Sequence, residues 1–169
     1  MSTTLAELAQ EQKTSAASGT MQLVSFHLAE ETFGVEITKV REIILMCGIT
    51  RVPQTPHYVK GLINLRSSVI PVIDLRTLFG LPESDQTDDS RIMVMQVGRR
   101  TVGIIVDGVD EVLRISQEQI APPPPTVANL GNEYLNGLVR LDEQLLILLD
   151  IDKILGQEEE ALATAVAGI

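Results

Sequence analysis

Short runs in which apolar and polar residues alternate recur along this chain of 169 residues, and they predict an all-β protein. Ten such runs are expected to be strands: 22–28, 32–37, 41–46, 61–66, 69–74, 91–97, 101–106, 111–115, 137–141 and 145–150. A short helical turn is expected after the fifth strand and again after the tenth, at 75–80 and 151–156. The pattern therefore predicts the same succession of elements twice.

The two sets of five strands align with one another, which indicates an internal duplication. Residues 58–80 align without a gap with residues 134–156, and residues 33–44 align with residues 102–113. The offsets are 76 and 69 residues, so an insertion falls in the proline-rich segment 122–133, where a longer loop costs little free energy. A unit of about sixty residues buries too little surface to be secure alone. We therefore expect the copies to share an interface or to exchange strands.

The same alignments divide the chain into a domain and two ends. Residues 21–156 are expected to form the domain, with one copy at about 21–83 and the other at about 90–156. Residues 1–20 are expected to be a flexible tail. Residues 157–169 are expected to be either a tail or a short helix.

The connection between the fourth and fifth strands lacks the Asn-Gly or Gly-Gly pair that favours a two-residue hairpin turn. Arg66, Ser67 and Ser68 stand there instead. Either Ser67 adopts a positive φ, at a cost of about 1 kcal/mol, or the three residues together form a wider loop. Since the aligned segment 142–144 carries three polar residues, we favour the wider loop, with Arg66 as its first exposed residue.

Composition narrows the classes of protein that fit this pattern. Apolar residues make up 44% of the chain and aromatic residues only 3%, so the core is expected to be aliphatic. The net charge of -10 argues against a nucleic-acid partner, which would need clustered Lys and Arg. We find no stretch with the length and apolarity of a signal peptide or a membrane span, and Cys47 is the only cysteine. A soluble, cytoplasmic protein without membrane insertion is therefore expected.

No combination of residues in the sequence points to catalysis, a cofactor or a metal ion. His27 and His57 are the only histidines, and neither has a neighbouring cysteine or acidic cluster. Cys47 follows an apolar run and lacks an adjacent base, so a buried, unreactive thiol is favoured over a nucleophile. The acidic segment 84–90 lacks the spacing of a calcium loop and fits a solvated linker. We expect neither an enzyme nor a bound cofactor.

The two copies differ most clearly in charge. Arg66 aligns with Asp142, and Arg41 aligns with Asp110, at positions expected in turns or on polar strand faces. Related surfaces of opposite charge suit a docking module that meets two partners. The alternative is that these charges have drifted on solvated faces without consequence.

Several blocks of the sequence occur in the order found in one bacterial family: KVREI, ITRVPQTPHYVKGLINLR, VIPVIDLR, VGIIVDGVDEVL and YLNGLVRLDEQLLILLDIDKIL. Across residues 21–156 the chain resembles the chemotaxis coupling proteins, the CheW-like family. The resemblance implies two intertwined SH3-like five-stranded β-barrels with short helical turns. It also implies a non-enzymatic adaptor that links the cytoplasmic tips of methyl-accepting chemoreceptors to the regulatory domain of the CheA-type histidine kinase. Such an adaptor is cytoplasmic and is recruited to receptor arrays at the membrane.

The resemblance also assigns roles to individual residues. Positions that match the family's receptor contacts are Val40, Glu42, Arg66, Val109 and Val112, and positions that match its kinase contacts are Ile49 and Gly61. Val40 aligns with Val109, and Ile43 aligns with Val112. We therefore expect an apolar groove between the barrels, with Glu42 and Arg66 at its rim. Because Glu42 recurs as Glu111, a partly structural role for Glu42 stays open.

Two alternative functions remain at this point. A CheW-like adaptor could serve twitching motility or another chemosensory-like pathway, which only its partners would distinguish. A small-ligand protein or an enzyme could use the space between the barrels, and it would show a polar pocket with perturbed titrating groups.

Overall fold

The structure is a computed structural model that describes residues 19–82, 85–122 and 135–154. The expected tails 1–20 and 157–169 lie almost entirely outside the described residues, as does most of the expected insertion. Strands dominate the described residues, and their bounds are β1 Thr20–Leu28, β2 Glu31–Glu36, β3 Val40–Leu45, β4 Val59–Leu65, β5 Ser68–Asp74, β6 Arg91–Val97, β7 Arg100–Val106, β8 Gly108–Ser116, β9 Ile120–Ala121, β10 Leu135–Leu141 and β11 Gln144–Leu149. Helices are single turns at α2 (Leu75–Leu78), η2 (Ile37–Lys39), η3 (Gln117–Gln119) and 151–154. The chain is all-β, as predicted.

The strands form two sheets, and each sheet closes into a small barrel. One sheet has the order β8-β1-β2-β11-β10-β9, and the other has the order β3-β6-β7-β5-β4. In the first, β8 continues through η3 into β9, which pairs with β10 at the opposite edge. In the second, the chain after β3 reaches Thr50, which pairs with Leu62 of β4. We call them the β1 barrel and the β6 barrel.

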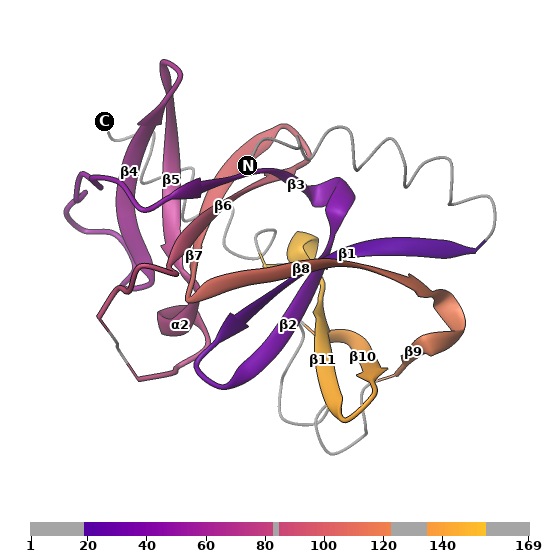
Figure 1. The fold of residues 1–169 in the computed structure, drawn as a ribbon. Coiled ribbons are helices and arrows are strands. Elements are labelled where there is room, and N and C mark those ends of the chain that lie inside the picture. The colour runs from indigo at the N-terminus through magenta and orange to yellow at the C-terminus, as the bar shows by residue number, and fades with distance from the viewer. Residues whose placement is uncertain (1–18, 83–84, 123–134, 155–169) are drawn as a thin grey trace.

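The two copies exchange one hairpin with each other. The β1–β2 hairpin comes from the first copy but pairs with β8 and β11 of the second copy. The β6–β7 hairpin comes from the second copy but pairs with β3 and β5 of the first. The parallel pairings show the same relation, because Gly34 lies opposite Leu148 and its counterpart Gly103 lies opposite Val72. In Figure 1 the indigo β1 and β2 accordingly lie among the orange strands, and the pink β6 and β7 lie beside the violet β4 and β5.

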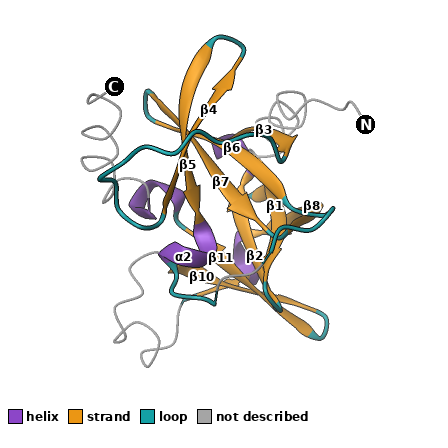
Figure 2. Ribbon diagram, turned by 90° about the vertical axis from the view of Figure 1, so that its left-hand side faces the viewer, coloured by secondary structure: helices purple, strands orange, loops and turns teal. Residues whose placement is uncertain are grey.

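Three apolar clusters fill this architecture. Each barrel has its own interior, and equivalent positions of the two copies line it, such as Ile63 and Ile70 in one and Val139 and Leu146 in the other. The largest cluster lies between the barrels and draws on β1, β2, β6, β7 and the helical turns. Full burial of one such side chain contributes about 1.5–3 kcal/mol, so the shared cluster joins the barrels into one unit. Figure 2 shows β4 and β10 at opposite ends of the molecule, with β1, β2, β6 and β7 between them.

All four hairpins within the barrels have two-residue turns, so the wider loop expected after Arg66 was wrong. Leu65 pairs directly with Ser68, which leaves Arg66 at φ 51° and Ser67 at φ 70° as the turn. The other three turns likewise begin with a residue at positive φ, namely Ala29, Gly98 and Asp142. Turns of this hand match the twist of the flanking strands, and that match outweighs the cost of positive φ at a side-chain-bearing residue.

Replacing Ser67 with glycine is expected to raise the free energy of unfolding by about 0.5–1 kcal/mol, because glycine adopts positive φ without a Cβ clash. The melting temperature should rise by about 2 °C. Ser68→Gly is the matched control, because Ser68 already lies in β5 and glycine weakens a strand. Thermal unfolding of both variants tests this, and equal or opposite effects would contradict the turn geometry.

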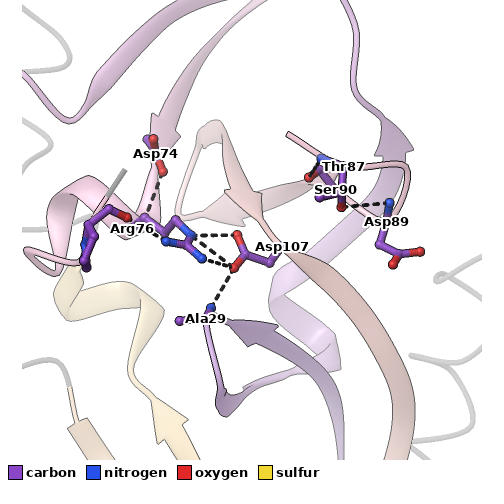
Figure 3. Close-up of polar contacts among 8 residues, drawn as sticks. Ala29, Asp74, Arg76, Thr87, Asp89, Ser90 and Asp107 are labelled. Carbon is purple, nitrogen blue, oxygen red and sulfur yellow. Dashed lines mark hydrogen bonds and ion pairs between the residues drawn. The ribbon is translucent and has the colours of Figure 1, made fainter. Parts of the chain in front are cut away.

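One ion-paired network braces the β1–β2 hairpin against the other barrel (Figure 3). Arg76 of α2 donates through Nε and Nη2 to the Asp107 carboxylate at 2.7–3.0 Å, and it donates through Nη1 to the carbonyl oxygen of Pro82. The same carboxylate accepts the backbone N–H of Ala29 at 2.6 Å. Asp74 caps the helical turn by accepting the backbone N–H of Arg76. Asp107 thus connects the end of one barrel with the first hairpin of the other.

A second ion pair involves the residue of the other copy that aligns with Arg76. Asp152, the counterpart of Arg76, lies 2.9 Å from the ammonium group of Lys39. Asp150 accepts the backbone N–H of Lys153, as Asp74 does that of Arg76. This pair is the more exposed of the two, with side chains 34% and 50% exposed. Only one member of each pair is a repeat counterpart, because Lys39 aligns with Gly108 and not with Asp107.

Candidate docking surface

Two edge strands carry the apolar residues that were predicted to meet a receptor. In β8, Asp110 and Glu111 together oppose Ser25 of β1 in a bulge. Because a bulge inserts one extra residue, Val109 and Val112 on either side of it face the same side of the sheet. The register of β3 shifts in the same way between Val40 and Glu42. The bulges thus explain why predicted docking positions three residues apart lie on one face.

Exposure differs among these apolar residues. Val112 is 37% exposed and Val109 is half-buried, so both present surface to solvent. Val40 is only 5% exposed and belongs to the cluster between the barrels, whereas Ile43 packs against that cluster and stays half-buried. The structure therefore gives Val40 little surface for direct contact, and Ile43 is the more accessible apolar residue of β3.

The structure brings Glu42 and Arg66 together. Arg66 donates through Nη1 and Nη2 to the two carboxylate oxygens of Glu42, at 2.8 and 3.0 Å. The Glu42 side chain is 20% exposed and the Arg66 side chain 75% exposed. A bidentate pair of this kind holds the guanidinium plane in one orientation. Two residues 24 positions apart thus form one polar feature at the surface of the β6 barrel.

Ile49 and Gly61, the two predicted kinase contacts, also lie side by side. Gly61 has φ +148°, and a Cβ built on it would lie 3.0 Å from Ile49 Cγ2 and 2.8 Å from the carbonyl carbon of Thr50. The backbones approach this closely because Thr50 and Leu62 exchange hydrogen bonds of 2.8 Å. Gly61 is buried, so its role is to let the segment after β3 close the barrel, and Ile49 is half-buried beside it.

The described residues include few groups that could serve as metal ligands or nucleophiles. The described part of the chain contains no group of three or more His, Cys, Asp or Glu side chains that could hold a metal ion. Cys47 is exposed, so the expected burial of its thiol was wrong. Nor is any helix within the described ranges long and apolar enough to cross a membrane.

Among the hollows lined by described residues, two have charged walls. One of about 170 Å³ lies beside Lys39 and Asp152. The other, of about 350 Å³, lies between β8 and the β1–β2 and β10–β11 hairpins. Neither includes Val109 or Val112, so the apolar groove that we expected does not coincide with either of them.

The ion pair between Arg76 and Asp107 shifts the pKa values of both residues. Partial burial raises the pKa of Asp107. The hydrogen bonds from Arg76 and from the Ala29 N–H, together with the Arg76 charge, lower it by a larger amount. The net result is a pKa below the usual value for aspartate. The hydrogen bond to Asp107 raises the pKa of Arg76 above its ordinary value, although burial opposes this. Both groups are therefore held in their charged forms.

Comparison with known proteins places the chain in a family. The model of the CheW-like domain matches residues 22–159. The chain belongs to the CheW-like family. The chemotaxis protein CheW of Klebsiella aerogenes is 40% identical over 96% of this chain and 98% of its own length. That of Treponema pallidum is 37% identical over 82% and 84%. Among solved structures, the scaffolding protein TtCheW from Thermoanaerobacter tengcongensis shares 38% identity and a TM-score of 0.72, over 77% of this chain and 88% of that one.

Membership of the CheW-like family makes the protein a non-enzymatic chemotaxis coupling adaptor. The fold agrees, because two intertwined SH3-like barrels were expected from the resemblance and two barrels with exchanged hairpins are observed. Sequence reasoning did not foresee the direct pairing of Glu42 with Arg66 or the Arg76–Asp107 brace. The recurrence of Glu42 as Glu111 was the one signal in the sequence that both copies build the same bulge.

Proposed function

We propose that this protein couples the cytoplasmic tips of methyl-accepting chemoreceptors to the regulatory domain of a CheA-type histidine kinase. The protein would act at receptor arrays beside the membrane, in contact with both partners at once. Family membership and the names of the relatives, which are chemotaxis proteins, favour this pathway over twitching motility. The observation that carries the proposal is the pairing of predicted residues into two separate features, Glu42 with Arg66 and Ile49 with Gly61.

The proposed receptor surface combines apolar contact with a polar rim. Val109, Val112 and Ile43 offer apolar area on β8 and β3, beside the cluster that joins the barrels. Such area suits one apolar face of a receptor helix. The paired Glu42 and Arg66 would orient that helix, since rim charges contribute more to specificity than to affinity. Val40 would support β3 from beneath.

The proposed kinase surface lies where the β6 barrel closes. Ile49 contributes apolar contact, and Leu45 at the end of β3 is 68% exposed. An exposed leucine at the end of β3 and a half-buried isoleucine four residues later offer a partner apolar contact. Gly61 would act through the shape of the backbone rather than by direct contact.

Replacing Arg66 with glutamate is expected to reduce receptor binding at least tenfold while kinase binding changes little. The substitution places a second carboxylate beside Glu42, which removes the ordered guanidinium and reverses the charge of the rim. Loss of an exposed ion pair changes stability by about 1 kcal/mol or less. Pull-down by a receptor signalling fragment and by the kinase regulatory domain measures both contacts.

Arg140→Glu is the matched control, because Arg140 is exposed on β10 and undergoes the same change of charge. It should leave receptor binding unaltered. Equal losses in the two variants would attribute the effect to net charge rather than to the Glu42–Arg66 pair. Folded wild-type protein that captured neither partner would refute the proposed function itself.

A further inference from the structure

The hollow of about 350 Å³ in the β1 barrel has no part in the proposed function. The residues that line it include the acidic Glu30, Asp110 and Glu111 together with His27 and the buried Ser25. His27 Nδ1 lies 3.0 Å from Asp110 Oδ1, so Asp110 has a partner. The Glu111 carboxylate makes no hydrogen bond or ion pair with any residue that the structure describes. The exposed Glu111 carboxylate therefore lies in an acidic hollow and has no ion pair with a described cationic side chain.

The other copy shows what binds at the equivalent position. Glu111 is the repeat counterpart of Glu42, and both lie at the bulge of an edge strand. Glu42 accepts two hydrogen bonds from a single guanidinium, that of Arg66. The counterpart of Arg66 is Asp142, which begins an equivalent two-residue turn at φ 48°. Both copies thus have a glutamate at a strand bulge and a two-residue turn, but only the first copy has an arginine in that turn.

The backbone of Glu111 is held in place for such a contact. Ser25 is only 2% exposed, and its hydroxyl donates to the carbonyl oxygen of Glu111 at 2.9 Å while accepting the Glu111 N–H at 3.0 Å. Leu141 and Gln144, which flank the β10–β11 turn, line the far side of the hollow. The carboxylate therefore projects from a fixed strand beside a fixed turn, which limits the entropy lost when a ligand binds.

The charges around Glu111 are also reversed relative to the other copy. Asp110 occupies the position of Arg41, and Glu30 occupies that of Arg99. In the β6 barrel the aligned positions thus carry two arginines, and Glu42 has its guanidinium from Arg66. In the β1 barrel the corresponding carboxylates surround a glutamate that lacks one, so the field favours a cation from outside.

We propose that this hollow binds the guanidinium of an arginine side chain presented by a partner protein, with Glu111 as its bidentate acceptor. Asp110 and Glu30 supply the surrounding negative charge. Arginine is favoured over lysine because its planar fork matches both oxygens of one carboxylate, as Arg66 does at Glu42. The site lies in the other barrel from the Glu42–Arg66 pair, and the proposal does not depend on the receptor or kinase contacts.

The test uses N-acetyl-arginine amide as the probe and the full chain at low ionic strength. Backbone amide resonances of His27, Asp110, Glu111 and Gln144 should shift on titration, and the neutral analogue N-acetyl-citrulline amide should leave them unmoved. Glu111→Gln should weaken the apparent affinity about tenfold, since a hydrogen bond to a charged group contributes about 1.5–3 kcal/mol. Glu143→Gln is the matched control, because Glu143 is an exposed carboxylate in the adjacent turn, and it should bind as the wild type does.

A second variant tests directly whether the Glu42–Arg66 pair is a valid model for the proposed site. Asp142→Arg places a guanidinium in the turn at the position that Arg66 occupies in the other copy, so it should fill the site from within and abolish the response to the probe. Its melting temperature should not fall. Shifts that persist in Glu111→Gln, shifts of equal size with the citrulline analogue, or undiminished binding by a folded Asp142→Arg variant would each overturn the proposal.

Discussion

Gly61→Ala is expected to lower the free energy of unfolding by about 3 kcal/mol or more, the largest loss expected from the addition of one methyl group in this protein. Gly61 has φ +148°, a region that side-chain-bearing residues rarely adopt, and backbone strain of this kind costs about 1–3 kcal/mol. The added Cβ would also meet the carbonyl group of Thr50 inside van der Waals contact. Backbone cannot move aside as a flexible side chain can, so the contact between Thr50 and Leu62 would have to open.

Thermal unfolding followed by circular dichroism measures this effect. A loss of 3 kcal/mol corresponds to a fall of about 6–12 °C in the melting temperature for a domain of this size. Gly48→Ala is the control, because nothing lies within 4 Å of a Cβ at Gly48 and its φ is not in the left-handed region. If Gly61→Ala melted with the wild type, the close approach of the two backbones would be wrong. A loss of kinase binding in this variant would follow from the distorted barrel and would not show direct contact.

Asp107→Ala should lower the free energy of unfolding by about 3 kcal/mol, because removal of one partner strands a charge that the fold has partly buried. Arg76 is only 15% exposed, and its Nε and Nη2 would lose their acceptor. The backbone N–H of Ala29 would lose its acceptor too. Asp152→Ala is the control within the same molecule. It breaks the more exposed ion pair with Lys39, and a loss of about 1 kcal/mol or less is expected there.

The double variant Arg76→Met, Asp107→Leu separates the charge from the packing. Replacing both ions by apolar residues leaves no unpaired charge, so the double variant should be more stable than Asp107→Ala. Urea unfolding of the single and double variants measures the difference. If the loss in the double variant equalled the sum of the losses in the two single variants, the charges of Arg76 and Asp107 would not stabilise one another.

The same carboxylate predicts how stability depends on pH. The folded-state pKa of Asp107 lies below its unfolded value of about 3.9. Its stabilising contribution is therefore fully present above pH about 4 and is lost as the pH falls through the folded-state pKa. The stability difference between wild type and Asp107→Asn should be constant from pH 7 to pH 5 and should shrink below pH about 4.

The alternation of apolar and polar residues was sufficient to predict the ten main strands, and the alignment of the two halves revealed the duplication. Neither observation predicted which strands pair across the copies, because a β1–β2 hairpin satisfies its own hydrogen bonds equally well beside β5 or beside β11. Counterparts such as Ile70 and Leu146 present the same apolar surface to either hairpin. The small size of each copy left exchange of strands open beside a shared interface, and only the family resemblance implied it, since local pattern does not show which copy supplies the partner strand.

The errors of prediction have physical causes. The turn at Ser67 was misjudged because the twist of β4 and β5 favours a two-residue turn of the positive-φ type, even where serine must adopt it. Cys47 was expected inside because the apolar run before it reads as buried, but Leu45 in that run is itself 68% exposed. Glu42 and Arg66 could not be paired in advance, because their contact depends on how the barrel closes around Thr50 and Leu62.

The exchanged hairpins also constrain how the chain acquires its structure during synthesis. The parallel pairing of the β1 barrel places Thr32 of β2 opposite Leu146 of β11, so it cannot form until β11 has been synthesised. The β6 barrel needs Gly103 opposite Val72, so neither copy completes a barrel from its own residues. The high sequence separation of these contacts favours slow, cooperative folding. A nascent chain that ends in the linker between the copies thus contains a full repeat but no folded half, and the adaptor reaches its native state only as a whole.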